Sequence, residues 1–209
     1  MERRRVVNLR QQWRDDAETN DRLLFTLIGI NVAVFVAWNW APPIVQLLMR
    51  GQFLVSAEAI AHYRLWTLLT YGFSHISAGH LIFNLLALWT FGRSVGEAHG
   101  WRALLHLYLV GAIAAGMGHV VYQLVTLDPS PALGASGAVM ALAVVYAATF
   151  PERVLMFNFL VPVPAPILVG GYILLDVLGM IGGGGGTANA AHLAGAAYGL
   201  GWWAWRTRR

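Results

Sequence analysis

The chain has 209 residues, of which 57% are hydrophobic and only 11% are charged, and its mean hydropathy is +0.57. Soluble domains carry about 25% charged residues, so this composition excludes a soluble domain and predicts an all-α, polytopic membrane protein. The absence of cysteine excludes disulfides, a thiol nucleophile and thiolate metal ligands. The formal net charge of +4 does not indicate nucleic-acid binding, because the positions of the arginines explain it better.

The apolar runs divide the chain into a short polar tail, a membrane domain and a second short tail. Residues 1–22 are polar, residues 23–205 form the predicted membrane domain, and residues 206–209 close the chain. A helix that crosses a bilayer needs about 20 apolar residues. Residues 44–77 are less apolar and are expected to lie in the membrane interface, with Tyr63 and Trp66 at headgroup level. The domain is expected to contain six spans, at 23–41, 78–95, 101–126, 134–150, 161–181 and 187–205.

The arginines are distributed unequally between the two sides of this predicted six-helix bundle. All fourteen basic residues are arginine, and one side holds only Arg50 and Arg64. The positive-inside rule then places both termini in the cytoplasm and directs Ser136 toward the extracytoplasmic side. The other twelve lie in the tails and in the loops after the second and fourth spans: Arg3, Arg4, Arg5, Arg10, Arg14, Arg22, Arg93, Arg102, Arg153, Arg206, Arg208 and Arg209.

Ser136 is expected at the start of a helix. The segment before it contains Pro129 and Pro131, which cannot lie inside a helix, and an apolar run follows from Gly137 to Phe150. Unpaired backbone N–H groups and the helix dipole at such a start favour negative charge, which suits a nucleophilic serine that creates an oxyanion. The structural alternative is a patch of small residues between packed membrane helices.

Ionisable and strongly polar side chains inside predicted spans are functional candidates, because burying them in a membrane is costly. His192 lies at a depth similar to that of Ser136, beside Ala191, Gly195 and Gly199, whose four-residue spacing lets another helix approach closely. Histidine is the usual general base for a serine. The structural alternative for His192 is a hydrogen bond to a carbonyl oxygen within a helix interface.

Four further polar residues within spans have weaker functional interpretations. His80 and Asn84 stand four residues apart on one helix face and offer donors for an oxyanion, or alternatively a side-chain pair that satisfies itself. His106 and His119 are expected to form interhelical bonds. The histidine spacing does not fit a His-Glu-x-x-His metal site, and Ala138 breaks the Gly-x-Ser-x-Gly elbow of soluble hydrolases.

Asp176 could orient a histidine as a third catalytic member. Its place in the middle of the predicted fifth span indicates a depth different from that of His192. We therefore interpret Asp176 as structural.

Three motifs on predicted spans resemble the core motifs of the rhomboid intramembrane serine proteases: His75 with His80-x-x-x-Asn84, Gly134-Ala135-Ser136-Gly137 and Ala191-His192-Leu193-Ala194-Gly195. The run from Trp66 to Gly92 also resembles the family around its second span, and the whole resemblance covers about residues 60–205. Two positions depart from the family pattern: Thr67 stands where an arginine often follows the tryptophan, and Met140 stands where an aromatic residue often packs on the base.

The resemblance implies a Ser–His dyad without an acid and without a cofactor or metal. Ser136 would be the nucleophile and His192 the base, with an oxyanion hole formed by His80, Asn84 and the Ser136 backbone N–H. The residues Gly134, Gly137, Gly195 and Met140 would support this site.

Substrates in this family are transmembrane helices, which are cleaved near their outer end. The fifth span and the loop Gly182–Gly186 would act as gate and cap. The short chain and the absence of a targeting segment favour a minimal bacterial type in the inner membrane, and the oligomeric state stays open. The competing interpretation is a catalytically silent relative that binds and escorts helices.

Overall fold

The computed structural model describes residues 2–157, 160–182 and 186–208, and it is predominantly helical, as expected. The elements in chain order are α1 (Glu2–Trp40), α2 (Pro43–Phe53), α3 (Ala57–Ala61), α4 (Thr67–Thr70), the 3-10 turn η1 (Tyr71–Phe73), α5 (Ala78–Ala87), the π-helical turn η2 (Leu88–Gly92), α6 (Arg93–His99), α7 (Trp101–Thr126), α8 (Ser136–Thr149), β1 (Val154–Phe157), β2 (Val161–Pro164), α9 (Ala165–Ile181) and α10 (Gly186–Thr207).

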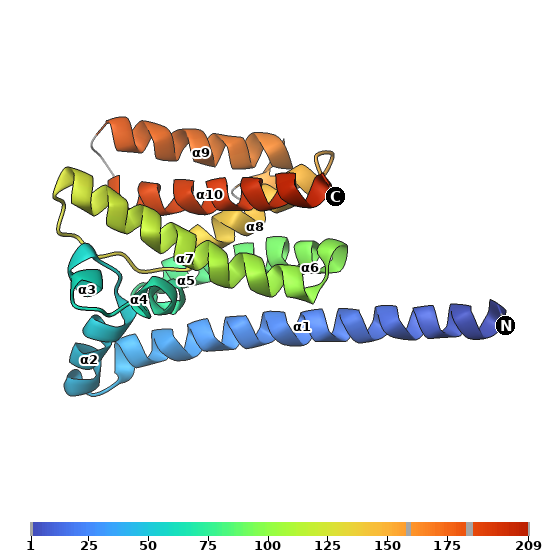
Figure 1. Ribbon diagram of the computed structural model, residues 1–209, viewed down its shortest axis with the longest axis horizontal. Helices are drawn as coiled ribbons and strands as arrows, with labels where there is room; N and C mark the ends of the chain where they lie inside the picture. The colour runs from blue at the N-terminus through green and yellow to red at the C-terminus, as the bar shows by residue number, and fades with distance from the viewer. Residues whose placement is uncertain (1, 158–159, 183–185, 209) are drawn as a thin grey trace.

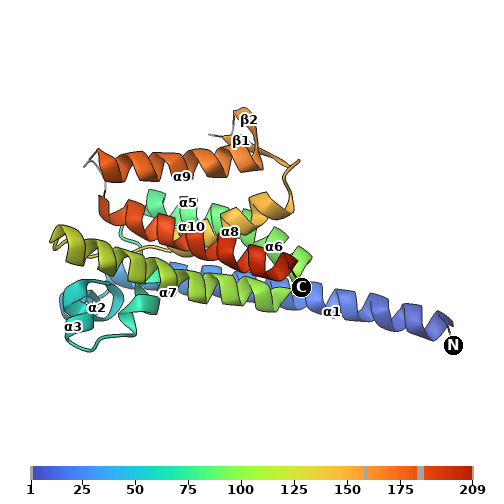
Figure 2. The same ribbon diagram turned by 45° about the horizontal axis from the view of Figure 1, so that its top comes forward.

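The long helices lie side by side, with α1 on one side of the bundle and α9 on the other (Figures 1 and 2). Helix α8 is the centre of the bundle, because every residue from Gly137 to Ala147 is buried except Met140, which is half-buried. A helix that is apolar all round belongs in such a position. It packs against α7 and α10, which also pack against each other, and α10 contacts α9 as well. The start of α8 is therefore enclosed by side chains from several helices.

Glycines on α10 allow its close contact with α8, as the four-residue spacing predicts. A Cβ atom at Gly195 would lie 2.1 Å from the Gly137 carbonyl oxygen, and one at Gly199 would lie 2.4 Å from the carbonyl oxygen of Ala141. No side chain fits at these distances, so the two backbones touch only because both positions are glycine. The contact at Gly195 is less than one helical turn from His192, and it fixes the height of that histidine against α8.

We expect Gly195→Ala to destabilise the folded protein by about 3 kcal/mol, because the added methyl group forces α8 and α10 apart and a packed core resists this. Thermal unfolding in detergent measures the effect. The matched control is Gly201→Ala in the same helix, where nothing lies within 4 Å of the new Cβ atom. That variant should change stability by no more than about 1 kcal/mol, in the stabilising direction. Equal stability of the two variants would contradict the close helix contact.

The structure differs from the expected spans at their ends. Helix α1 begins at Glu2, so residues 2–22 continue the first span as helix, and the N-terminal part of α1 projects beyond the bundle (Figure 1). The second span continues through η2 and α6 to His99. The third span agrees with α7 at both ends. These differences arise because hydropathy marks where a helix enters water, whereas the helix ends only where its backbone geometry changes, as at Gly100 with φ +90°.

The first four residues of the expected fifth span form a strand instead of helix. Val161–Pro164 pairs in antiparallel register with Val154–Phe157, so that Val154 faces Pro164 and Met156 faces Pro162. Pro162 and Pro164 cannot lie within a helix, but a two-stranded hairpin has only edge strands, on which proline is tolerated. Helix α9 begins directly after the second of these prolines, at Ala165. The membrane helix is therefore shorter than expected.

Two described helices are long and apolar enough to cross a membrane by composition alone, at Asp15–Trp40 and Trp101–Thr126. Two shorter apolar helices are α8 and α9. At 1.5 Å per residue, the 14 residues of α8 extend about 21 Å, less than the roughly 30 Å of a hydrocarbon core. A helix enclosed by protein need not match the bilayer thickness. The count of six spans stays a prediction.

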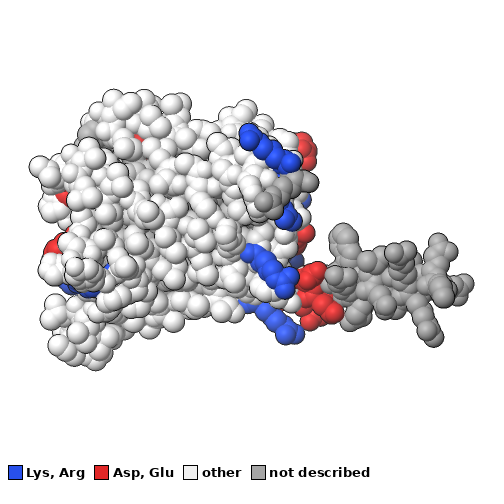
Figure 3. Space-filling model, viewed as in Figure 1, with Lys and Arg blue, Asp and Glu red and all other residues white. Residues whose placement is uncertain are grey.

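Helix α1 enters and α10 leaves the bundle at the same end (Figure 1). The arginine side chains drawn in Figure 3 gather there, with a few charges at the opposite end. We call this the arginine-rich end and define it by Arg93, Arg102, Arg153, Arg206 and Arg208. The sequence predicts that this end faces the cytoplasm, and this orientation stays a prediction.

The segment expected in the interface folds into α2, α3, α4 and η1. Thr67, which departs from the family pattern, is fully buried there, and its hydroxyl donates a hydrogen bond of 2.6 Å to the Arg64 carbonyl oxygen. The Ser74 hydroxyl donates to the Phe53 carbonyl oxygen at 3.0 Å. The segment is thus held by short polar contacts, of which Thr67 makes one.

Candidate active site

Ser136 is the first residue of α8, as the sequence predicts. The first hydrogen bond of this helix runs from the Val139 N–H to the Ala135 carbonyl oxygen at 2.9 Å. The N–H groups of Ser136 and Gly137 therefore precede the helical hydrogen-bond ladder and point out of the helix start. Gly134, two residues before the serine, has φ +125°, a conformation that side chains other than glycine rarely adopt. This turn presents the Ser136 side chain at the edge of the helix.

The structure brings His192 of α10 to Ser136 of α8. The distance between His192 Nε2 and Ser136 Oγ is 2.8 Å, a normal hydrogen bond. If the imidazole carries its proton on Nδ1, then Nε2 accepts from the serine hydroxyl, the orientation that removal of the serine proton requires. The glycine contact between α8 and α10 holds the two helices at the distance that this bond needs.

Asp176 of α9 also reaches His192, so the expectation that the two residues lie at different depths is wrong. Its carboxylate oxygens lie 3.1 and 3.2 Å from His192 Nδ1, so an Nδ1–H would donate to the carboxylate. The Asp176 side chain is only 12% exposed and that of His192 only 23% exposed. The carboxylate, the imidazole and the hydroxyl thus form one chain of hydrogen bonds across three helices.

The depth argument against Asp176 failed because it placed the residue relative to the middle of the span and not relative to the end that adjoins the sixth span. Helix α9 ends at Ile181, as expected, and Asp176 lies five residues before this end. His192 lies six residues after Gly186, where α10 begins. At 1.5 Å per residue these positions are about 8 and 9 Å from the adjoining ends of two neighbouring antiparallel helices. The two side chains therefore lie at the same depth.

A cleft of about 270 Å³ opens beside Ser136. His80 enters it from α5, and a Cβ atom at Gly134 would lie 2.7 Å from His80 Cε1, so the imidazole covers the glycine backbone directly. His75 is fully buried behind His80, with 4.9 Å between the ring centres. The residues that line the cleft are Tyr71, His80, Pro131, Ala132, Leu133, Gly134, Ser136, Gly137, Ala188 and Ala191.

Gly134→Ala tests this packing. The new methyl group would strain the turn at φ +125° and push the His80 ring away from the cleft. We expect the rate of any reaction at Ser136 to fall on the order of 100-fold, the cost of losing one oxyanion donor. Gly79→Ala, which adds a methyl group in open space one residue from His80, is the control and should keep the full rate. Rates of serine labelling compare the two variants, and equal rates would exclude a role for the His80–Gly134 contact.

The structure places the other predicted site residues around this centre. Asn84 is buried, and its Nδ2 donates to the His80 carbonyl oxygen at 2.9 Å, which leaves the second N–H of the amide outside that bond. Gly137 packs against α7, where an added Cβ atom would lie 2.3 Å from Ala115 Cβ. Met140 is half-buried against the core of the bundle. Of Gly182–Gly186, residues 183–185 lie outside the described part of the chain.

The remaining histidines do not belong to this centre. His106 is bonded through Nε2 to the Tyr198 hydroxyl at 2.5 Å, which confirms an interhelical bond between α7 and α10. His119 is fully buried in α7. Within the described residues, no three histidine, aspartate or glutamate side chains are grouped to hold a metal ion.

The sequence did not single out Tyr71, and it led us to consider Asp176 but to interpret it as structural. Tyr71 lines the cleft. Its carbonyl oxygen accepts a hydrogen bond of 2.9 Å from the Gly134 N–H, and its hydroxyl donates one of 2.9 Å to the Ala112 carbonyl oxygen. It therefore fixes the serine turn against α7, and no local pattern marks that role. Asp176 had a usable signal, since a carboxylate within an apolar helix needs a partner.

A helical membrane bundle in which a serine at a helix start meets a histidine from a neighbouring helix defines a class of protein, the membrane-embedded proteins with a serine-hydrolase type of site. The comparison with known families agrees with this class. Residues 62–209, more than half of the chain, match the rhomboid domain family. The chain belongs to the rhomboid family, which is a family of intramembrane serine proteases.

Several named relatives are similar to the chain over most of its length. RHOMBOID-like protein 12, mitochondrial, of Arabidopsis thaliana is 34% identical over 201 residues, which cover 90% of this chain and 59% of the relative. Rhomboid protein 1, mitochondrial, of Saccharomyces cerevisiae is 32% identical over 192 residues, which cover 87% of this chain and 53% of the relative. The human presenilin-associated rhomboid-like protein, mitochondrial, is 28% identical over 191 residues, which cover 90% of this chain and 49% of the relative.

The chain thus spans about half the length of the curated relatives it matches. These relatives are mitochondrial by name, and a further one, Rhomboid-like protein 16 of Arabidopsis thaliana, is chloroplastic. They support a membrane protein, but they give no support to the bacterial inner membrane that the sequence favoured.

Proposed function

We propose that the chain is an intramembrane serine endopeptidase that uses Ser136 as nucleophile and His192 as base. The observation that carries this proposal is the hydrogen bond of 2.8 Å between Ser136 Oγ and His192 Nε2 at the start of α8. Membership of a family of intramembrane serine proteases supports it. A serine and a histidine packed together only for structural reasons would need neither the cleft beside them nor a carboxylate on the far side of the imidazole.

The reaction proceeds in two acyl-transfer steps. Ser136 Oγ adds to the carbonyl carbon of the scissile peptide bond while its proton passes to His192 Nε2, and the carbonyl oxygen becomes an oxyanion. Collapse of this intermediate breaks the C–N bond, and the imidazolium returns the proton to the leaving amine. A water molecule then adds to the acyl-enzyme with the same base, and Ser136 is released as the hydroxyl.

The oxyanion would be stabilised from the cleft. The N–H of Ser136 at the helix start and the His80 ring are the nearest donors, and the free N–H of the Asn84 amide is the third. His80 and Ser136 line the cleft, whereas Asn84 lies one helical turn further along α5. We therefore assign the main part of the stabilisation to His80 and the Ser136 N–H.

Asp176 acts through His192 in this proposal and is a positioning residue. Its carboxylate accepts the Nδ1–H, which keeps the proton off Nε2 while the serine is attacking, and it stabilises the imidazolium that forms. The site thus works as a triad, whereas the family resemblance implies a dyad.

The substrates are transmembrane helices cleaved near their extracytoplasmic end. The distribution of arginines supports this orientation, because Ser136 lies at the end of α8 that faces away from the arginine-rich end. The helix α9 then acts as the gate through which a substrate segment reaches the cleft.

Labelling with a fluorophosphonate tests the proposal on the detergent-purified chain. The wild type should react covalently at one residue, Ser136, and the adduct is identified by mass spectrometry of peptides. A folded wild type that remains unlabelled under conditions that label a control serine protease would overturn the enzyme proposal and favour the silent, helix-binding relative.

A further inference from the structure

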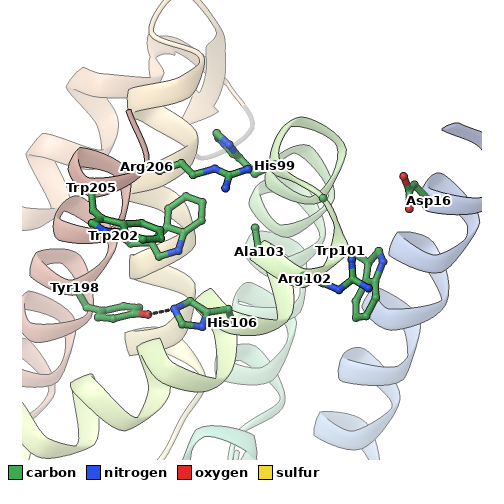
Figure 4. Close-up of a pocket in the computed structure, with 11 residues that line it drawn as sticks. Asp16, His99, Trp101, Arg102, Ala103, His106, Tyr198, Trp202, Trp205 and Arg206 are labelled. Carbon is green, nitrogen blue, oxygen red and sulfur yellow. Dashed lines mark hydrogen bonds between the residues drawn. The ribbon is translucent and has the colours of Figure 1, made fainter. Parts of the chain in front are cut away.

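A second and larger cleft lies at the arginine-rich end, far from Ser136. Its volume is about 740 Å³, and it opens between α1, the first turn of α7 and the last turns of α10 (Figure 4). Because α7 begins at Trp101 and α10 ends at Thr207, both walls of the cleft are ends of long membrane helices. The cleft therefore lies where the hydrocarbon core of a bilayer gives way to its headgroups.

Two arginines from different helices face this cleft. Arg102 projects from α7 and lies against Trp101 on the α1 side, whereas Arg206 projects from α10 and lies beside His99 (Figure 4). Within the described residues, neither has a carboxylate within 4.0 Å. Asp16 of α1 is the acidic residue of the lining. The cleft carries a net positive charge.

Tryptophans form the apolar walls of the same cleft. Trp202 packs edge-on against the His99 ring, with 5.5 Å between ring centres, and Trp205 lies one turn further along α10. The Arg102 guanidinium lies 4.7 Å from the centre of the Trp101 ring, and this contact restricts the position of its charge. Tryptophan is enriched at the headgroup level of membranes, where its ring meets both apolar and polar groups.

We propose that this cleft binds the headgroup of an anionic phospholipid, which Arg102 and Arg206 attract from two walls of the cleft, with the upper acyl chains against Trp202 and Trp205. Basic pockets between membrane helices are a known type of site for such lipids. The first turn of α7 adds to the attraction, because the N–H groups of Trp101 and Arg102 precede its first hydrogen bond, from Ala103 to Gly100. A soluble phosphate would use the arginines but not the tryptophan walls, and an acidic peptide would not need a site at the bilayer surface.

Native mass spectrometry of the full, delipidated chain tests this site. Phosphatidylglycerol is titrated against phosphatidylcholine with the same acyl chains, so that only the headgroup charge differs. We expect the wild type to prefer phosphatidylglycerol. Arg102→Gln/Arg206→Gln should weaken its binding roughly thirtyfold, which corresponds to about 1 kcal/mol for each arginine. Arg102→Lys/Arg206→Lys keeps the charge and should keep most of the affinity.

The matched control is Arg22→Gln/Arg153→Gln, which removes the same charge outside the cleft and should leave the affinity within about twofold of the wild type. An equal loss in both glutamine pairs would overturn the proposal, because the attraction would then be a general surface charge. Full competition by glycerol phosphate, or by an acidic peptide, at the same concentration as the lipid would also overturn it. Thermal unfolding of each variant shows that the chain is folded.

Discussion

Ser136→Ala and His192→Ala should each lower the rate of substrate cleavage by at least about 10⁴-fold, to below detection. The first variant removes the atom that forms the acyl-enzyme. The second leaves the Ser136 hydroxyl without the acceptor that now lies 2.8 Å away. Because the two side chains act as one unit, the double variant should be no slower than either single variant. Cleavage of a single-span membrane protein in reconstituted vesicles, followed by electrophoresis, measures all three.

Controls separate this loss from misfolding. Ser94→Ala and His62→Ala remove the same groups from sites outside the cleft and should leave cleavage unchanged. Ser136→Ala deletes a single oxygen, so its free energy of unfolding should stay within about 1 kcal/mol of the wild type. Normal cleavage by both Ser136→Ala and His192→Ala would show that the hydrogen-bonded pair is structural.

Much of the site could be predicted because its signals are local in the sequence. Pro129 and Pro131 exclude helix before Ser136, and the apolar run that follows sets the start of α8. The spacing of Gly195 and Gly199 predicts a close helix contact in the same way, and the structure supplies the partner, α8. Residue types alone decide these features.

The partner of His192 on its far side was missed, although the expected spans place Asp176 and His192 each five residues from the adjoining ends at 181 and 187. What the sequence could not show is that the two side chains face one another. This depends on which faces of α9 and α10 meet, and hydropathy does not decide it because both helices are apolar on most sides. The pairing of Val161–Pro164 with Val154–Phe157 could not be predicted either, because hydropathy assigns the second of these strands to a membrane span.

Asp176 connects the base to α9, which the family resemblance identifies as the gate. A carboxylate in an apolar helix is costly unless a partner compensates it, and here the compensating partner is the imidazole. When α9 moves away from α10, that bond must lengthen, and His192 then loses the group that sets its proton on Nδ1. Movement of this helix would therefore be coupled to the reactivity of Ser136 through one hydrogen bond.

Asp176→Asn should reduce kcat on the order of 10²–10⁴-fold with KM little changed. The amide has nearly the same shape, but its N–H can donate to Nδ1. The imidazole then carries its proton on Nε2, and a protonated Nε2 cannot accept from the Ser136 hydroxyl. Asp176→Glu keeps the charge and should recover part of the rate. Thermal unfolding of Asp176→Asn should be unchanged or raised, since a partly buried charge is removed. A purely structural Asp176 would instead lower the unfolding temperature and leave kcat of the folded fraction intact.

The control for loosened packing between the two helices is Asn189→Ala. The Asn189 amide lies against Gly179, where a Cβ atom would be 2.0 Å from Nδ2, so this residue packs α10 against α9. The hydrogen bonds of the His192 ring go to Asp176 and Ser136 and do not involve Asn189. If its loss slowed the reaction as much as Asp176→Asn does, the effect would come from the position of α9 and not from the carboxylate. A rate close to the wild type in Asn189→Ala, together with recovery in Asp176→Glu, would assign the loss in Asp176→Asn to the missing carboxylate. The wild type and Asp176→Glu both offer a carboxylate to His192 Nδ1, whereas Asp176→Asn offers an amide.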